Sequence, residues 1–259
     1  MEELKIDPKK VAKKLIKFIA EEVNKTGYKK AVLGLSGGVD SATTACLGQE
    51  ALGKKNVFGI IMPHQALKSE DIRDAENLTR SLRINCRVIS IEPALKGFKK
   101  IFSKIDHIRQ GNIMARLRMI VLYDFSKTLE ALVLGNSNKS EWMLGYATIY
   151  GDMACALNPL GNLYKTQVWQ LAQYLGIPKT IISKPPSAGL WPGQTDEQEL
   201  GLRYKELDPL LYYMVDLGYD DDKLIELGFK QETISKIKGK IKSSGFKRKM
   251  PLVAEIKVT

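Results

Sequence analysis

Residues 36–41, Ser-Gly-Gly-Val-Asp-Ser, are the part of this 259-residue chain whose types and spacing point most clearly to chemistry. They follow a short apolar run and precede a helical pattern, and a helix N-terminus exposes unpaired N–H groups and a partial positive charge. Gly37 and Gly38 would let an anion approach these groups without a Cβ in the way. The hydroxyls of Ser36 and Ser41 add donors, so the segment predicts a phosphate cradle. No lysine follows it, which separates it from the common G-x-x-x-x-G-K-[ST] loop.

Asp40 lies inside this cradle, where its carboxylate would repel a phosphate group. A divalent cation between the two charges removes the repulsion, and Mg²⁺ normally binds one or two protein carboxylates together with phosphate oxygens. The alternative is an aspartate that only caps the helix, with Gly-Gly as a plain turn. Because strand, glycines, hydroxyls and acid coincide within six residues, the pattern favours a metal-assisted phosphate site.

Four short apolar runs predict buried strands, and helical patterns fill the gaps between them. The predicted strands are residues 31–35, 57–62, 87–91 and 131–134, and the predicted helices are residues 11–23, 41–52, 69–82 and 114–129. This alternation indicates an α/β fold, with a doubly wound, mostly parallel sheet and helices on both faces. In such sheets ligands bind at the carboxyl edge, which is where residues 36–41 would lie.

The last third of the chain has a different pattern. A helix is predicted over residues 166–175, because Gly176 and Pro178 provide stop signals. Residues 183–196 are rich in proline and glycine and predict a long loop, and helical segments continue to about residue 243. No linker separates two domains, so we expect one unit with a helical C-terminal part.

Composition narrows the class of protein. Hydrophobic residues make up 44% and charged residues 27%, as in ordinary soluble globular proteins. No apolar run approaches the ~18 residues that cross a bilayer, and no signal peptide begins the chain. The three cysteines form no C-x-x-C pair, which fits a reducing, cytoplasmic compartment. Forty Lys and Arg against 29 Asp and Glu give +11, which suggests an anionic partner or simply a solvated basic surface.

Two blocks of sequence resemble known families. Residues 36–41 resemble the S-G-G-x-D-S signature of the ATP pyrophosphatase superfamily, with its Rossmann-like, adenine nucleotide alpha hydrolase-like fold. Residues 135–152 resemble the G-[TN]-x-N-K-S-E … G-Y-x-T-x-Y-G-D region of the NAD synthetase family. Further matching blocks are residues 115–119, 158–160, 163–165, 186–188, 192–197 and 247–251. The resemblance extends from about residue 11 to 251.

The resemblance implies an activity: a ligase that forms a C–N bond. It would convert nicotinic acid adenine dinucleotide (deamido-NAD), ATP and ammonia to NAD, AMP and pyrophosphate through an adenylated intermediate, the last step of NAD biosynthesis. It further implies Mg²⁺ as cofactor, a homodimer, small-molecule substrates, and neither nucleic acid nor membrane as partner. Residues 1–259 would form a single NAD synthetase domain with no glutaminase domain, so free ammonia, or ammonia from a partner, is the expected nitrogen donor.

The resemblance also implies roles for residues at the matching positions. The implied ATP-binding residues are Gly34, Leu35, Ser36, Gly37, Gly38, Val39, Asp40, Ser41, Asn136, Lys165 and Ser187. Arg116 and Lys247 would bind deamido-NAD, Asp40 and Glu141 would bind the metal, and Asp40, Asp152 and Lys165 would be catalytic. Residues 183–196 are the candidate lid.

Local alternatives remain for three of these residues. Glu141 could be a first-turn glutamate that the helix dipole favours. Lys165 begins a helix, where the dipole opposes a cation, so it indicates a phosphate partner unless it is simply solvated. Asp152 could orient or deprotonate ammonium, or could be an ordinary turn residue after a glycine.

Two positions depart from the family pattern. Ala156 replaces an aspartate that many members place on the substrate, and Phe246 replaces a histidine in the His-Lys pair. Both changes put dinucleotide contacts in doubt and leave the ATP cradle intact. The rival hypotheses are another adenylating enzyme, such as one similar to GMP synthetase or a tRNA thiolase, and a nucleotide-binding module without turnover.

Overall fold

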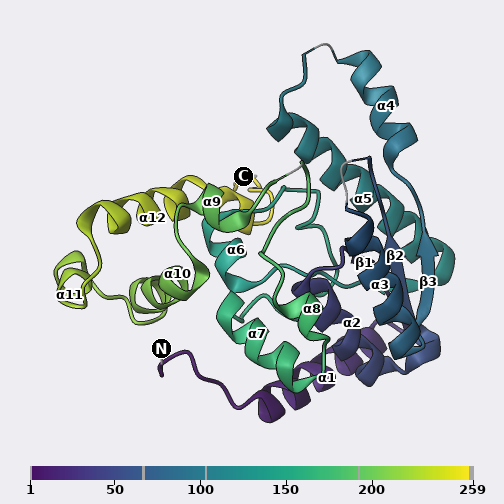
Figure 1. Cartoon of the computed structure of the whole chain (residues 1–259), viewed down its shortest axis with the longest axis horizontal. Coiled ribbons are helices and arrows are strands. Elements are labelled where there is room, and N and C mark those ends of the chain that lie inside the picture. The colour runs from purple at the N-terminus through teal and green to yellow at the C-terminus, as the bar shows by residue number, and fades with distance from the viewer. Residues whose placement is uncertain (1, 66–67, 103, 192, 257–259) are drawn as a thin grey trace.

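The structure, a computed structural model, describes residues 2–65, 68–102, 104–191 and 193–256. Four parallel strands form one sheet: β1 (Lys30–Leu35), β2 (Val57–Ile61), β3 (Asn85–Val88) and β4 (Ala131–Val133). Their order is β3-β2-β1-β4, so the chain builds outward from β1 and then returns to its other side. Figure 1 shows β1, β2 and β3 next to one another. The strand order reverses between β1 and β4, and such a switch point is where open α/β sheets bind ligands. The doubly wound α/β fold predicted from the sequence is confirmed.

Helices cover both faces of the sheet because successive strand residues point to opposite sides. One face packs against α1 (Pro8–Lys25), α2 (Val39–Leu52) and α3 (Ser69–Leu82), and Ala31, Leu33 and Leu35 of β1 belong to that core. The other face carries Val32, which packs with α4 (Glu92–Ile101) and α5 (His107–Leu129). A short 3-10 helix, η1 (Lys54–Asn56), leads into β2.

A helical part follows the sheet, as the sequence predicts (Figure 1). Its elements are α6 (Lys139–Leu144), α7 (Lys165–Tyr174), α8 (Lys179–Ile182), α9 (Asp196–Leu200), α10 (Tyr204–Leu211), η2 (Tyr212–Asp216), α11 (Asp221–Glu226), α12 (Gln231–Ser243) and η3 (Gly245–Arg248). A separate apolar core lies among α6 and α9 to α12, with Tyr204 and Leu207 fully buried in it. None of the helices in the described ranges is both long and apolar enough to cross a lipid bilayer.

Some boundaries differ from the sequence prediction. The third strand is Asn85–Val88 and not residues 87–91, because α3 ends at Leu82, Arg83 takes the left-handed conformation (φ 54°), and the chain is extended soon afterwards. The next helix, α4, begins at Glu92 and has Pro93 in its first turn, where proline is well suited. The helix predicted over residues 114–129 starts earlier, at His107, because Asp106 caps it.

Candidate active site

The phosphate cradle predicted at residues 36–41 joins the carboxyl end of β1 to α2. Its hydroxyls hold the turn together: Ser41 Oγ donates to the Gly38 carbonyl at 3.0 Å and lies 3.1 Å from Ser36 Oγ. The backbone N–H groups of Val39, Asp40 and Ser41 donate to no acceptor within the described residues. These first-turn amides at the positive end of α2 therefore remain available to an anion.

Gly37 is the position where the cradle needs glycine. Its φ is +81°, and a Cβ there would lie 2.3 Å from the carbonyl oxygen of Asp71. The first turn of α3 therefore packs directly against the cradle, and this contact closes one side of it. Only a residue without a side chain fits.

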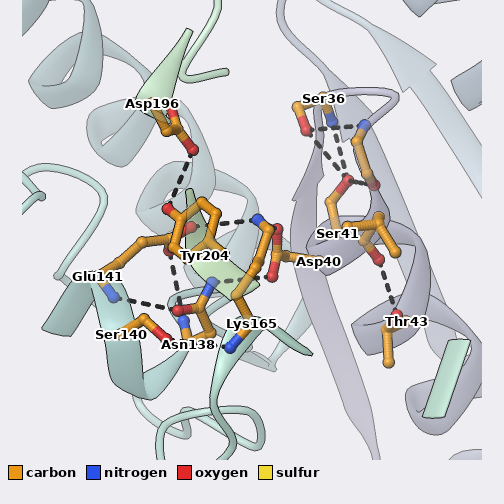
Figure 2. Close-up of polar contacts among 12 residues, drawn as sticks. Ser36, Asp40, Ser41, Thr43, Asn138, Ser140, Glu141, Lys165, Asp196 and Tyr204 are labelled. Atoms are coloured by element: carbon orange, nitrogen blue, oxygen red, sulfur yellow. Dashed lines mark hydrogen bonds and ion pairs between the residues drawn. The ribbon is translucent and has the colours of Figure 1, made fainter. Parts of the chain in front are cut away.

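Asp40, Glu141 and Lys165 meet beside the cradle, although they come from three separate segments (Figure 2). Lys165 Nζ donates to Asp40 Oδ2 and lies 3.3 Å from Glu141 Oε1. The Lys165 side chain is 3% exposed, so its charge depends on these carboxylates. Asn138 Nδ2 donates to Asp40 Oδ1 at 3.1 Å, which fixes the orientation of the carboxylate.

Local structure explains how α6 presents Glu141. Asn138 and Glu141 form a capping box: the Glu141 backbone N–H donates to Asn138 Oδ1 at 3.0 Å, and the Asn138 N–H donates to Glu141 Oε2 at 3.4 Å. Glu141 therefore has the helix-start role that the sequence left open, and its role as a metal ligand stays a prediction. One oxygen caps the helix while the other contacts Lys165.

Burial and mutual repulsion shape the electrostatics of the cluster. Burial, with the nearby charges of Asp40 and Asp196, raises the pKa of Glu141 to about 8, although Lys165 opposes the shift. Burial would lower the pKa of Lys165, but Asp40, Glu141 and Asp196 outweigh it and raise that pKa. Asp40, Glu141 and Asp196 therefore surround one buried ammonium group, and a further cation at this place would favour the ionised form of Glu141.

Two residues at the same edge of the sheet have buried polar atoms without a partner in the part of the chain that the structure describes. Asn136, which follows β4, donates from Nδ2 to the Gly34 carbonyl at 2.9 Å, while its Oδ1 is buried without a donor among the described residues. His64, which follows β2, is 6% exposed, and neither ring nitrogen has a partner in the same set. Orphaned polar atoms of this kind fit a polar ligand that completes them.

Arg116, Asp152 and Lys247 gather on a second side of the site, around the segment 145–152. Arg116 donates to the Ile149 carbonyl at 3.3 Å, and Lys247 Nζ donates to the carbonyls of Gly145 and Ala147 at 2.8 Å each. Asp152 Oδ1 accepts from the Thr148 N–H at 2.8 Å. Although Asp152 keeps contact with solvent, surrounding protein removes much of its hydration, which raises its pKa.

The loop over residues 183–196 contacts the cradle through a residue that the sequence analysis missed. Lys184 Nζ lies 2.6 Å from both Asp71 Oδ1 and Asp74 Oδ2 of α3, and 3.3 Å from the Gly37 carbonyl. Ser187, the expected ATP contact, accepts from the Gly189 N–H at 3.0 Å, and its contact with ATP stays a prediction.

Other contributors to the charge cluster were also missed. The Tyr204 hydroxyl donates to Asp196 Oδ2 at 3.3 Å, and Lys165 Nζ lies 5.4 Å from the centre of the Tyr204 ring (Figure 2). Asn138 has a local signal that could have found it, because Asn followed by Glu three residues later is typical of a helix start. Tyr204 has no such signal.

A Gly-rich turn at the switch point of a parallel sheet, with free amides and a buried acid–lysine cluster beside it, defines an α/β nucleotide-binding protein. The family model described as NAD synthase matches residues 11–251. The chain therefore belongs to the NAD synthase family, which agrees with the resemblance found in the sequence.

Individual relatives are similar over nearly the whole chain. An NH(3)-dependent NAD(+) synthetase of Trichlorobacter lovleyi is 49% identical over 256 residues, which cover 99% of this chain and 94% of the relative. Among solved structures, an NMN synthetase from Francisella tularensis has a TM-score of 0.86 at 35% identity, covering 97% of this chain and all of that one. An NH3-dependent NAD synthetase from Campylobacter jejuni, in complex with the nitrate ion, has a TM-score of 0.83 at 36% identity, covering 96% and 100%.

Proposed function

We propose that this chain catalyses the ATP-dependent amidation of deamido-NAD with ammonia, producing NAD, AMP and pyrophosphate. The observation that carries the proposal is the meeting of Asp40, Glu141 and Lys165 beside a cradle of free amides. A nicotinate carboxylate resists attack by ammonia because it is already anionic and its leaving group is oxide. Its transfer to the α-phosphate of ATP creates an acyl adenylate, from which AMP leaves readily.

The residues of the cradle stabilise charge that develops on the departing pyrophosphate. Preorganised donors aimed at developing charge are usually a large term in catalysis, and the amides of α2 are such donors. Lys165 has its ammonium group between two carboxylates, and it would turn toward the phosphates when ATP is bound. The hydrogen bond from Asn138 Nδ2 fixes the orientation of the Asp40 carboxylate.

Mg²⁺ fits the acidic pair of this site. No group of three or more His, Cys, Asp or Glu side chains in the described ranges could hold a metal by itself. Asp40 and Glu141 would provide the one or two carboxylates that Mg²⁺ normally takes from protein, with ATP oxygens and water completing its shell. When bound, the ion would neutralise negative charge on the phosphoryl oxygens.

Arg116 and Lys247 are proposed to bind the dinucleotide, with Asp152 near the acyl carbon. Their common position around segment 145–152 supports this assignment, and a carboxylate with a raised pKa is better suited to accept a proton from ammonium. The loop over residues 183–196 is proposed to close over the adenylate, because such intermediates hydrolyse in water.

A second substrate is favoured by one comparison. A structural relative that covers nearly the whole chain is named an NMN synthetase. Ala156 and Phe246 remove an acid and a hydrogen-bonding ring from the expected dinucleotide contacts. Nicotinic acid mononucleotide carries the same reacting carboxylate, so it is the alternative acceptor to test.

AMP formation distinguishes these hypotheses. The protein is incubated with ATP, Mg²⁺ and ammonium, and with deamido-NAD, nicotinic acid mononucleotide, xanthosine monophosphate or tRNA. AMP formed with deamido-NAD supports the proposal, and a higher kcat/KM with the mononucleotide would favour the alternative acceptor. AMP with xanthosine monophosphate or tRNA would support a rival adenylating enzyme, and no AMP with any substrate would indicate a binding module.

We further propose a homodimer that works in the cytoplasm. Helix α5 supports the dimer, because it exposes Ile120 and Tyr123 at 56% and 40%. The three cysteines are free, which fits a reducing compartment. Light scattering at micromolar concentration should give twice the chain mass, and a monomer would contradict the dimer.

A further inference from the structure

Asp208 of α10 is completely buried and binds the first turns of two other helices. The Ser140 hydroxyl of α6 donates to Asp208 Oδ1 at 2.6 Å, and the Thr166 backbone N–H of α7 donates to Oδ2 at 2.8 Å. Ser140 Oγ in turn accepts from the Lys165 N–H at 3.0 Å. One carboxylate and one hydroxyl therefore join α10 to both helices that carry the charge cluster.

Asp216, eight residues later, repeats this pattern on the neighbouring residues. Lys139 Nζ of α6 lies 2.6 Å from Asp216 Oδ1 and 2.8 Å from Oδ2. The hydroxyl of Tyr164, the residue before α7, donates to Asp216 Oδ2 at 3.1 Å. Both acids therefore contact the same two helix starts, side by side.

A π-helical turn allows the two acids to do so. In a regular α-helix, a residue eight positions further along is rotated by about 80°. Residues Tyr212–Asp216 form a π-helical turn, in which the Leu217 N–H donates to the Tyr212 carbonyl at 3.1 Å. Such a turn takes one more residue than an α-helical turn, so Asp216 returns toward the side occupied by Asp208.

We infer that Asp208 and Asp216 are positioning residues that hold α6 and α7 together, so that Glu141 and Lys165 stay in register with Asp40. Glu141 follows Ser140 directly in the chain, and Lys165 is bound through its own backbone N–H. A shift of either helix start therefore moves one member of the charge cluster. Neither acid needs to touch a substrate for this role.

The charge of Asp208 has a second effect at α7. The N-terminal end of a helix carries a partial positive charge, which disfavours a cation such as Lys165 at its first position. The Asp208 carboxylate accepts a hydrogen bond at this same end and offsets the unfavourable charge. The residues that follow the sheet therefore help to assemble the site as well as to cover it.

The test replaces each acid by its amide and uses an acid of the same part of the chain as control. Asp208→Asn and Asp216→Asn keep side-chain shape, and Asp221→Asn removes an exposed acid of α11 that pairs with Lys238. Because a misplacement of about 1 Å can cost roughly 10²-fold in rate, D208N should lower kcat for AMP formation by about that factor. D216N should lower it less, since its carboxylate is 30% exposed, and D221N should leave it unchanged.

A KM-against-kcat comparison separates positioning from plain stability. The variants should show a lower kcat with the KM for the dinucleotide unchanged. The reason is that Arg116 and Lys247, which are proposed to bind the dinucleotide, lie outside the first turns of α6 and α7. Ser140→Ala should reproduce the loss, and the S140A/D208N double variant should be no slower than D208N alone. This single-hydroxyl variant also provides the test if D208N fails to fold.

The inference rests on the proposed function, and the two can fail separately. Absence of AMP with wild-type protein would overturn the function. If the wild-type protein is active, and folded D208N and S140A both keep the wild-type kcat, only the positioning role is overturned. A lower melting temperature with unchanged kcat in both variants would mean that these contacts contribute to stability alone, and this result would also overturn the positioning role.

Discussion

Gly37→Ala is the substitution with the clearest structural consequence for the cradle. The new Cβ would lie 2.3 Å from the Asp71 carbonyl oxygen and 2.9 Å from its Cα and carbonyl carbon. Ordinary contact begins near 3.4 Å, so the first turn of α3 must move by about 1 Å. Asp71 also pairs with Lys184, so the movement disturbs the contact between the loop 183–196 and the cradle.

Backbone strain adds to this effect and can be controlled for. A left-handed φ costs an alanine about 1–2 kcal/mol, and the stiffer unfolded chain returns about 0.4–1 kcal/mol. Gly27 has nearly the same φ, +80° against +81°, and nothing lies within 4 Å of its would-be Cβ. It lies at the opposite end of β1 from the cradle, so Gly27→Ala measures the strain alone.

Pyrophosphate release at varied ATP concentration is the assay, with thermal unfolding in parallel. Gly27→Ala should lower stability by roughly 1 kcal/mol and leave kcat/KM for ATP unchanged. Gly37→Ala should lower kcat/KM for ATP by about 10²-fold, equivalent to about 2.7 kcal/mol of transition-state stabilisation. Equal kcat/KM values in the two variants would refute the argument that the cradle is shaped by close packing at Gly37.

Three further predictions concern single side chains. Asp40→Ala should abolish pyrophosphate release while circular dichroism stays native, and near-normal turnover would defeat the metal assignment. Lys184→Met should raise the KM for ATP, because Lys184 fixes the Gly37 carbonyl and α3; an unchanged KM, as expected for the remote control Lys238→Met, would contradict this. Burial raises the pKa of Asp208 to about 6, so between pH ~4 and ~6 the folded protein keeps a proton that the unfolded chain has lost. Its unfolding free energy should therefore fall by up to about 3 kcal/mol as pH rises through this window. Denaturant unfolding of Asp208→Asn should lack this contribution, and equal pH slopes would refute it.

The sequence predicts the centre of the site well because its signals are local. Residues 36–41 combine a strand end, paired glycines and an acid within one turn, and Glu141 lies within a helix-start pattern after the fourth strand. Parallel strands bring both segments to one edge, so their meeting follows from the order of elements. The strand order itself, with β1 between β2 and β4, supplies the remaining constraint.

The supporting contacts could not be predicted because they pair distant residues that have no local signature. Lys184 contacts a carbonyl 147 positions earlier, and Asp208 contacts a hydroxyl 68 positions earlier. An isolated lysine before two prolines, or an acid before Pro209, indicates nothing about such partners. The same holds for Asp216, which reaches its partners only through a π-helical turn that the apolar pattern does not reveal.

Diffraction from crystals soaked with a non-hydrolysable ATP analogue and Mn²⁺ tests the central claim most directly. Manganese gives an anomalous signal and takes the oxygen ligands that suit Mg²⁺. The account predicts one peak bound by Asp40 and Glu141, phosphates on the first-turn amides of α2, and Lys165 turned toward them. A triphosphate bound elsewhere, with the amides of Val39 to Ser41 still free and the peak away from both acids, would contradict it.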